Sequence, residues 1–345
     1  MLMMNEKDKN NYLGYFGGKT GAERNPKGYQ RRDDGNHYYK SDEYYEWWYV
    51  DASFDNGYHM VTTFHHMNMF LKPIVPSIQI MIYKPDGTQV SRYALIKPEE
   101  NYAGADWCDV LMGENRLKDR GDGTYDLYVM INKVGIQLRM KNIVPGWKLG
   151  SGTGYRNEET GDVAGWAVAV PYGEAEGEIY LKDETIKVQG AVYHDHNWGN
   201  ILLHKLCKKW YWGRLHGKKY TIDYAHTYAK PDDAPDTGQI MIARGKDIIL
   251  SSTIMNTRLE NMVIDEKTGQ QYARKLTLTG DALGVEFQLA IQTKRLVETM
   301  LLPKSVEWDQ YYFRFLADYT LEIKIDGVQD MEEGELLHEY MVLNP

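Results

Sequence analysis

Residues 191–200 concentrate side chains that could carry out acid–base chemistry. They read Ala-Val-Tyr-His-Asp-His-Asn-Trp-Gly-Asn and contain the candidate catalytic residues His194, Asp195 and His196 in a row. Imidazole and carboxyl groups are common proton donors and acceptors in enzymes. The run is β-like as far as Gly199, and a rigid strand would aim these side chains better than a loop would.

The two faces of this predicted strand would differ, because successive side chains point to opposite sides. The predicted faces are Val192, His194, His196 and Trp198 on one side, and Tyr193, Asp195 and Asn197 on the other. The alternative is an aromatic strand that simply closes a barrel. That interpretation explains the Tyr and Trp, but it does not explain two histidines beside an aspartate. His and Asp are poor strand formers, and their side chains are costly to bury without partners. We therefore favour a functional role.

Glu46 is a reserve candidate for the proton donor. It lies in the aromatic run 44–51, on the same predicted strand face as Trp48. If Glu46 faces inward, burial beside indoles would raise its pKa and make it a candidate acid. The alternative is an ion pair with an arginine at the barrel rim, and the sequence favours neither. The indole of Trp48 is itself more typical of a core.

Two histidine pairs raise the question of a metal site. They are His65-His66 and His194 with His196. A zinc site needs a third protein ligand and supporting hydrogen bonds, and the sequence shows neither a nearby glutamate nor a cysteine pair, so we expect no metal. The sequence contains no Gly-x-Ser-x-Gly motif, so it does not indicate a serine hydrolase. Residues 150–154, Gly-Ser-Gly-Thr-Gly, are better interpreted as a flexible loop between strands than as a nucleotide-binding loop.

The composition indicates a folded chain with more than one domain. With 345 residues, 43% of them hydrophobic, the usual domain size predicts two domains. The formal net charge of −9, without a long run of Lys or Arg, argues against nucleic acid as a partner. The 27 Tyr and 9 Trp exceed the 7 Phe, which favours cavities lined by aromatic side chains with polar tips.

The cysteines and the N-terminal residues bear on the compartment. Cys108 and Cys207 provide no disulfide framework, so buried thiols are the simplest interpretation. The first residues lack the apolar core of a secretion signal, and no stretch of about 18 apolar residues could span a bilayer. We therefore expect a cytoplasmic protein.

The chain reads as a succession of short strands. Residues 44–51 and 58–65 flank an Asp-Asn-Gly turn at 55–57, which is a good hairpin signal because Asn and Gly accept positive φ. Further short strands follow at regular spacing. This pattern predicts an all-β protein built from antiparallel sandwiches or barrels.

The second half of the sequence repeats the first. Residues 210–215 and 220–228 resemble the opening hairpin, and residues 335–341 take the place of 190–196. A long-period duplication predicts two copies of one barrel-like unit. The predicted organisation is an extended lead-in over residues 1–43, a barrel over 44–200, a short helical linker over 201–209 and a second barrel over 210–345.

The hairpin of the second half carries further candidate ligand-binding residues. They are Trp212, Arg214, Tyr224 and His226. An aromatic stripe alone would indicate a core. This one includes a cationic and a titratable side chain, so we favour a pocket with polar tips, with arginine stacked on indole as the alternative.

Three motifs together resemble a known family. They are Glu46-Trp-Trp-Tyr-Val-Asp51, Tyr193-His-Asp-His-Asn-Trp-Gly199 and Trp210-Tyr-Trp-Gly-Arg-Leu215. Their order, over residues 40–345, is similar to that of the AttH-like, lipocalin-like proteins that include carotenoid 1,2-hydratase, also called hydroxyneurosporene synthase. Lipocalin-like Diels–Alderases and kievitone hydratase resemble them in architecture. The resemblance implies two lipocalin-like antiparallel β-barrels in tandem, a hydrophobic ligand pocket at or between them, and no metal or organic cofactor.

A hydratase hypothesis follows for an isoprenoid- or polyketide-like substrate. Adding water to a carbon–carbon double bond needs an acid, aromatic faces for the cation and a group that holds the water. An imidazolium at His194 or His196 is the favoured donor, oriented by Asp195, and Asp195 itself and Glu46 are the other candidate acids. Asn197 would hold the water. The predicted cation-facing walls are Tyr193, Trp198 and Trp48.

Two alternatives stay open. A cofactor-free cyclase or pericyclase would pre-fold a polyene and polarise one carbonyl group. A non-catalytic carrier of the lipocalin type would bind the same apolar molecule unchanged. In each case the expected partner is a hydrophobic small molecule, which peripheral contact with a membrane would help the protein to collect.

Overall fold

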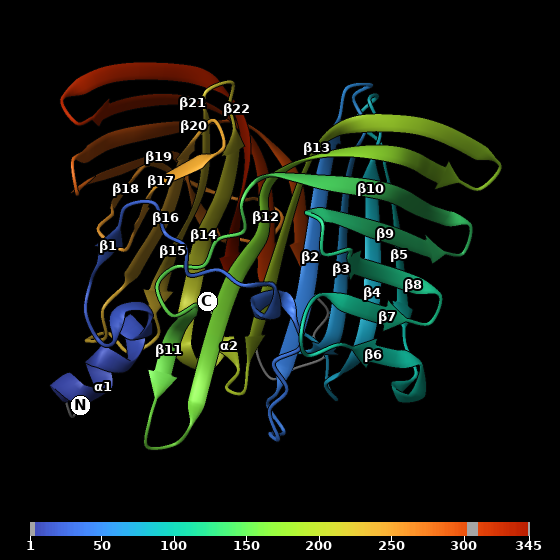
Figure 1. Ribbon diagram of the computed structural model, residues 1–345, viewed down its shortest axis with the longest axis horizontal. Coiled ribbons are helices and arrows are strands. Elements are labelled where there is room, and N and C mark those ends of the chain that lie inside the picture. Colours follow the sequence, from blue (N-terminus) through green and yellow to red (C-terminus); the bar gives the residue numbers. More distant parts are fainter. Residues whose placement is uncertain (1–3, 302–309, 344–345) are drawn as a thin grey trace. The chain divides into compact units, whose positions relative to one another are not determined.

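The computed structural model describes residues 4–301 and 310–343, and most of its regular structure is β-strand (Figure 1). The strands form two antiparallel sheets, each curled into a half-barrel. This confirms the all-β class with two lipocalin-like antiparallel barrels that the sequence predicts.

Two compact units make up the chain. The N-terminal unit consists of Gly28–Lys148 and Ala164–Leu202. The C-terminal unit consists of the residues up to Lys27, Leu149–Val163 and the chain from Leu203 onward. The lead-in before Tyr44 is therefore divided between the units.

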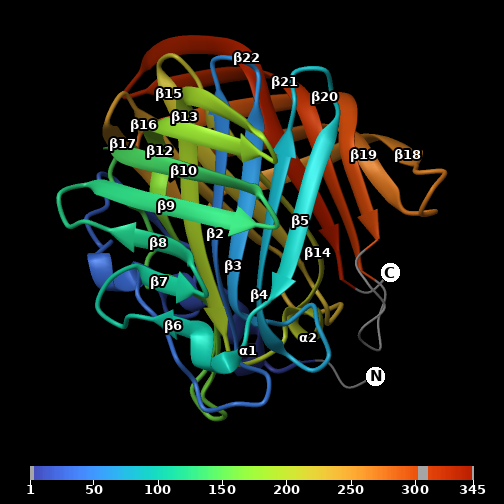
Figure 2. The ribbon, with the colours of Figure 1, turned by 90° about the vertical axis from the view of Figure 1, so that its right-hand side faces the viewer.

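The sheet of the N-terminal unit has the order β5-β4-β3-β2-β13-β12-β10-β9-β8-β7-β6 (Figure 2). Its strands are β2 (Tyr45–Phe54), β3 (His59–Asn68), β4 (Val75–Tyr83), β5 (Gln89–Leu95), β6 (Asn101–Ala103), β7 (Asp109–Met112), β8 (Asn115–Asp119), β9 (Thr124–Ile131), β10 (Val134–Val144), β12 (Asp162–Leu181) and β13 (Glu184–Gly199). β13, which carries residues 191–199, thus lies between β2 and β12, with its backbone held on both sides.

The sheet of the C-terminal unit has the order β1-β17-β16-β15-β14-β22-β21-β20-β19-β18. Its strands are β1 (Ala22–Glu23), β14 (Cys207–His216), β15 (Tyr220–Ala229), β16 (Thr237–Arg244), β17 (Asp247–Ser252), β18 (Asn256–Ile264), β19 (Gln271–Ala282), β20 (Val285–Leu301), β21 (Tyr311–Ile325) and β22 (Val328–Val342). A further strand is β11 (Thr153–Asn157).

The helices of the described residues are short. They are α1 (Glu6–Asn10), η1 (Asn11–Phe16), η2 (Arg31–Asp34), η3 (Pro98–Glu100) and α2 (Leu203–Leu206). In the described part of the chain, no helix has the length and apolar character needed to cross a membrane.

The internal repeat predicted from the sequence is visible in the strand order. The order β4-β3-β2-β13-β12 in one unit corresponds to β16-β15-β14-β22-β21 in the other. Residues 335–341 lie in β22 beside β14, just as residues 190–196 lie in β13 beside β2. Each unit has its own hydrophobic core, with Trp48 and Phe64 in one and Phe313 and Phe315 in the other.

The predicted opening hairpin is confirmed. β2 and β3 are joined by a turn in which Gly57 has a φ of 82°, a backbone conformation that suits glycine.

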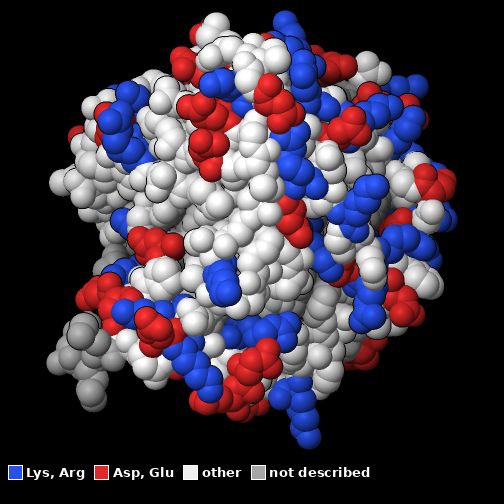
Figure 3. Space-filling model, turned by 60° about the vertical axis from the view of Figure 1, so that its left-hand side comes forward, with Lys and Arg blue, Asp and Glu red and all other residues white. Residues whose placement is uncertain are grey.

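On the face drawn in Figure 3, acidic and basic side chains lie interspersed rather than gathered into a patch of one sign.

Candidate active site

β13 carries the predicted catalytic residues on two different faces. It runs in unbroken register with β2 from Gly190 to Gly199, so its side chains alternate regularly. His194 and His196 are fully buried, at 0% exposure, on the face that adds Val192 to the core of the N-terminal unit. The opposite face carries Tyr193, Asp195 and Asn197.

His194 is held between a carboxylate and a backbone carbonyl. Its Nε2 lies 3.1 Å from Asp34 Oδ2, and its Nδ1 lies 2.8 Å from the carbonyl oxygen of Tyr49. The Tyr125 hydroxyl donates to the same Asp34 oxygen at 3.2 Å. Burial lowers the pKa of His194, but the Asp34 charge and the hydrogen bonds outweigh burial and raise the pKa above its usual value. The site therefore favours the imidazolium form.

His196 has the same type of environment. Its Nε2 lies 2.8 Å from Glu46 Oε1, and its Nδ1 lies 3.2 Å from the carbonyl oxygen of Asp33. Trp48 stacks on the ring, with 4.3 Å between the ring centroids and 13° between the planes. Both nitrogens of both imidazoles therefore face an acceptor supplied by the protein.

Glu46 is a fully buried carboxylate surrounded by donors. Its Oε1 accepts the backbone N–H of His37 at 2.7 Å in addition to bonding with His196. Its Oε2 accepts hydrogen bonds from the Tyr44 hydroxyl and the Asn36 amide. Burial raises the pKa of Glu46, but the bonds from His196 and His37 outweigh burial and hold the pKa well below its usual value.

Two expectations from the sequence are corrected here. The pKa of Glu46 is lowered rather than raised, because donors satisfy the buried carboxylate, and its partner is His196 rather than an arginine. The carboxylates that bond to the imidazoles are Asp34 and Glu46, not Asp195, because Asp195 points to the other face of β13.

Asp195 is the centre of a separate polar group on that other face. Its Oδ2 accepts the Tyr193 hydroxyl at 2.9 Å and Trp166 Nε1 at 3.2 Å. Its Oδ1 accepts the Asn197 amide at 3.1 Å. Asp195 is 5% exposed, and donors on β12 and β13 hold its carboxyl group in place.

Aromatic side chains of neighbouring strands flank Asp195. In register, Asp195 lies beside Tyr49 of β2, and Asn197 lies between Trp47 of β2 and Trp166 of β12. Trp47 and Tyr49 are both half-buried. A carboxyl group among large aromatic faces is the kind of surface that a hydrophobic ligand with one polar reaction centre would need.

The predicted cation-facing walls are divided between the two faces. Tyr193 lies beside Asp195. Trp48 and Trp198 lie with the imidazoles instead, and Trp198 stacks on His37 at 3.8 Å with 6° between the planes.

The other four predicted ligand-binding residues, Trp212, Arg214, Tyr224 and His226, lie in the C-terminal unit. They do not form one stripe, because they lie on both faces of the sheet. Arg214 pairs in register with Asp223 across β14 and β15, so Arg214 and Trp212 lie on one face of that sheet. Tyr224 and His226 lie on the other face, where Tyr224 is part of the hydrophobic core. The prediction that these four side chains line one pocket is therefore wrong.

Several residues of the site were not predicted. Asp34, Asn36 and His37 come from the lead-in, where no periodicity marks them, and Asp34 reaches His194 across 160 residues of sequence. Trp166 lies in β12, and nothing in the sequence indicates that its indole N–H meets Asp195.

An open groove of about 1110 Å³ lies elsewhere in the N-terminal unit. Its walls combine charged residues such as Arg139, Glu178 and Lys187 with apolar surface. The predicted catalytic residues are not among its lining residues.

Three crystal structures resemble this one. An AttH candidate from Nitrosomonas europaea has a TM-score of 0.68 at 15% identity, covering 92% of this chain and 98% of its own. CghA with Sch210972 has a TM-score of 0.66 at 12% identity, covering 88% and 89%. Kievitone hydratase from Nectria haematococca has a TM-score of 0.57 at 14% identity, covering 86% and 88%.

The chain has the AttH-like, lipocalin-like fold. Similarity to known proteins at the level of sequence is low. The chain is 24% identical over 186 residues to hydroxyneurosporene dehydrogenase of Chlorobaculum tepidum, a match that covers 52% of this chain and 44% of that protein. The chain thus spans less than half the length of this curated relative. No family model matches the sequence.

Proposed function

We propose that this AttH-like protein binds a hydrophobic isoprenoid- or polyketide-like molecule and adds water to one of its carbon–carbon double bonds. Asp195 is the acid in this proposal. The observation that carries it is the placement of the Asp195 carboxyl, which is bonded to Trp166, Tyr193 and Asn197 among aromatic side chains. The fold that the chain shares with kievitone hydratase is consistent with this class of reaction.

The hydrogen bonds of the imidazoles favour Asp195 over the histidines as the acid. Each nitrogen of His194 and His196 already faces Asp34, Glu46 or a backbone carbonyl oxygen. A proton donor must reach the substrate directly or through one water molecule. We therefore assign the two imidazoles to holding β13 in place.

The proposed reaction requires a proton on Asp195 at its start. Its proton passes to the less substituted alkene carbon, so that a C–H bond forms as the π bond breaks and a tertiary cation results. The faces of Trp166 and Tyr193 stabilise this cation. A water molecule held by the Asn197 amide attacks the cation, and the surplus proton of the water returns to Asp195.

The test compares two buried aspartates of the same unit. Asp195→Asn should lower the hydration of an acyclic polyene isoprenoid by at least about 10²-fold, the usual contribution of a general acid. Asp51→Asn is the matched control, because Asp51 is also 5% exposed and also accepts a tyrosine hydroxyl, from Tyr49. Mass spectrometry in isotopically labelled water would detect the added oxygen. Full activity in Asp195→Asn, or loss in Asp51→Asn alone, would reject the assignment.

A cyclase is the second candidate. The hydroxyl of Tyr193 and the N–H groups of Trp166 and Asn197 surround the Asp195 carboxyl, which with a proton on it could donate a hydrogen bond to a carbonyl group of a folded polyene and polarise it. Product mass separates the candidates, because cyclisation leaves the mass unchanged and hydration adds one water.

A further inference from the structure

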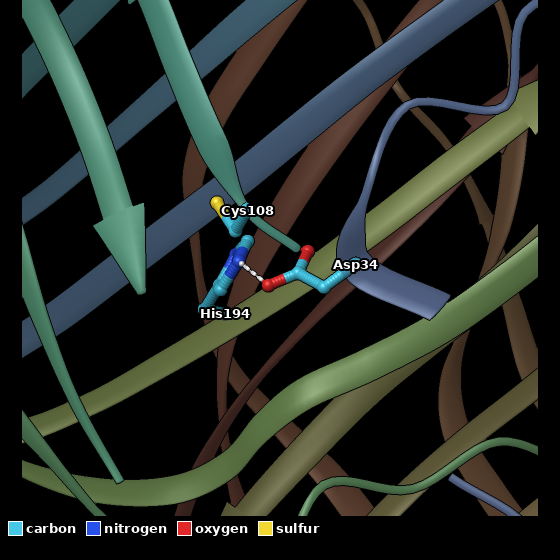
Figure 4. Close-up of side chains that lie close together, drawn as sticks. All are labelled: Asp34, Cys108 and His194. Carbon is cyan, nitrogen blue, oxygen red and sulfur yellow. Dashed lines mark hydrogen bonds and ion pairs between the residues drawn. The ribbon is translucent and has the colours of Figure 1, made fainter. Parts of the chain in front are cut away.

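We propose that Asp34, Cys108 and His194 form a buried zinc-binding site in the N-terminal unit. The three side chains come from η2, from the residue just before β7 and from β13 (Figure 4). The site lies on the imidazole face of β13, opposite Asp195, and is independent of the proposed hydration chemistry.

The ligand atoms converge closely enough for one ion. A carboxylate oxygen of Asp34, Sγ of Cys108 and a ring nitrogen of His194 all lie within 4.8 Å of one another. Tetrahedral zinc, with bonds of about 2.0–2.3 Å, places its ligand atoms roughly 3.3–3.6 Å apart. The observed upper bound of 4.8 Å is at most about 1.5 Å wider than this, a difference that side-chain rotations would have to close on binding.

The hydrogen bonds around the ligands are those that a metal site requires. Nδ1 of His194 bonds to the carbonyl oxygen of Tyr49 at 2.8 Å, which turns Nε2 toward Asp34. A metal-bound histidine usually donates its other N–H in this way. The Tyr125 hydroxyl donates to Asp34 Oδ2 at 3.2 Å and orients the carboxylate.

One atom of the site lacks a partner. Asp34 is 1% exposed, yet its Oδ1 has no hydrogen-bond partner among the described residues. Buried polar atoms without a partner are rare and often mark a bound water or ion. The free lone pairs of Oδ1 supply the third protein ligand that a zinc site needs and that the sequence alone does not reveal.

The charges of the three ligands suit zinc. A thiolate and a carboxylate together balance Zn²⁺, and a neutral imidazole leaves the buried site without net charge. Coordination displaces the Cys108 thiol proton and the proton on His194 Nε2, and both leave to solvent. Sulfur and imidazole nitrogen favour zinc over magnesium or calcium.

A neighbouring cluster is less suitable. His37, Glu46 and His196 also bring possible ligand atoms together. The two oxygens of Glu46, however, already accept hydrogen bonds from His37, His196, Tyr44 and Asn36. A metal there would have to displace donors from both carboxylate oxygens, whereas at Asp34 only Oδ2 accepts hydrogen bonds, from His194 and Tyr125, and Oδ1 accepts none from the described residues.

The packing of the two ligand-bearing segments gives the ion a structural role. A Cβ on Gly35, next to Asp34, would lie 2.4 Å from the carbonyl oxygen of Ala105 in the loop that leads to Cys108. Asn36 donates its backbone N–H to Gly104 in the same loop at 2.7 Å. Zinc would tie this pair of segments to the central strand β13.

The experiment uses the full chain, produced in zinc- or cobalt-supplemented medium and freed of any affinity tag. We expect about one zinc per chain by elemental analysis and, with cobalt, a thiolate-to-metal charge-transfer band. Cys108→Ser should abolish both. Cys207→Ser is the matched control, because Cys207 is the other buried cysteine, and it should keep both. Tyr125→Phe should weaken zinc binding by about 10–100-fold.

Each outcome decides the proposal. Wild-type protein without bound metal and without the cobalt band overturns it, even if Cys108→Ser fails to fold. Metal that both cysteine variants retain overturns it as well, because the ligands then lie elsewhere. Asp195→Asn should keep its zinc, so failure of the hydration proposal and failure of this one remain distinguishable.

Discussion

The charge of His194 follows from its two contacts. A neutral imidazole has one N–H and one lone pair, whereas both nitrogens of this ring face oxygen acceptors, Asp34 Oδ2 and the carbonyl of Tyr49. Only the imidazolium satisfies both. This agrees with the raised pKa of His194 despite its complete burial.

The stability of the metal-free protein should therefore depend on pH through His194. Its folded pKa lies above the unfolded value, so its stabilising contribution is complete below about pH 6.5 and is lost as the pH rises through the folded pKa. In buffer with a chelator, the difference in free energy of unfolding between wild type and His194→Gln should shrink from about pH 6 to pH 9. Urea titration of both proteins at each pH measures this difference in the free energy of unfolding.

His226 provides a control of opposite sign. Burial lowers its pKa, so its contribution to stability should fall as the pH decreases through the unfolded value of about 6.5. The difference between wild type and His226→Gln should therefore change with pH in the opposite direction. A His194 difference that stays constant or grows with rising pH contradicts the charge assignment.

At the scale of elements, β12 and β13 pack closely where Gly165 of β12 faces the indole of Trp198 of β13. Gly165 of β12 pairs in register with Trp198 of β13, and a Cβ on Gly165 would lie 2.3 Å from Cε2 of that indole. The indole therefore lies across the glycine, and its other contacts include the stacked ring of His37. The sequence marks Gly199 as the end of the strand, but it does not reveal this cross-strand need for glycine.

Gly165→Ala should displace the Trp198 indole. We expect a loss of about 1–3 kcal/mol in the free energy of unfolding, as for other overpacked sites, and a change in near-ultraviolet circular dichroism. Gly104→Ala is the control, because its added Cβ would meet its nearest atom at 3.4 Å, an ordinary contact. Equal stability of the two variants would show that Trp198 is not held against β12.

At the scale of the whole molecule, the two units have separate cores. Phe64 lies in one core and Phe315 in the other, and each core is built from residues of its own unit. Units with separate cores commonly open as separate cooperative regions.

Phe64→Ala should thus destabilise one unit selectively. The lost side chain should cost about 3–5 kcal/mol in that core. Hydrogen exchange should become faster in Gly28–Lys148 and Ala164–Leu202, while the strands β14 to β22 keep their protection. Phe315→Ala should give the reverse pattern. Uniform acceleration along the chain in both variants would indicate one cooperative unit.

The sequence alone determined the fold class, the duplication and the strand that carries the site. Period-two alternation and an Asp-Asn-Gly turn are local signals, so they can be recognised from the sequence without knowledge of tertiary contacts. The same alternation places His194 and Asp195 on opposite faces, and the structure agrees. These features depend on neighbours within a few residues.

Only the tertiary structure decided which groups meet. Glu46 becomes a stable carboxylate because His196, 150 residues away in sequence, reaches it together with donors from the lead-in. Asp34 stands in a lead-in without periodicity, yet it is the partner of His194. Charge state and ligand geometry depend on contacts between segments far apart in sequence, and local patterns do not encode such contacts.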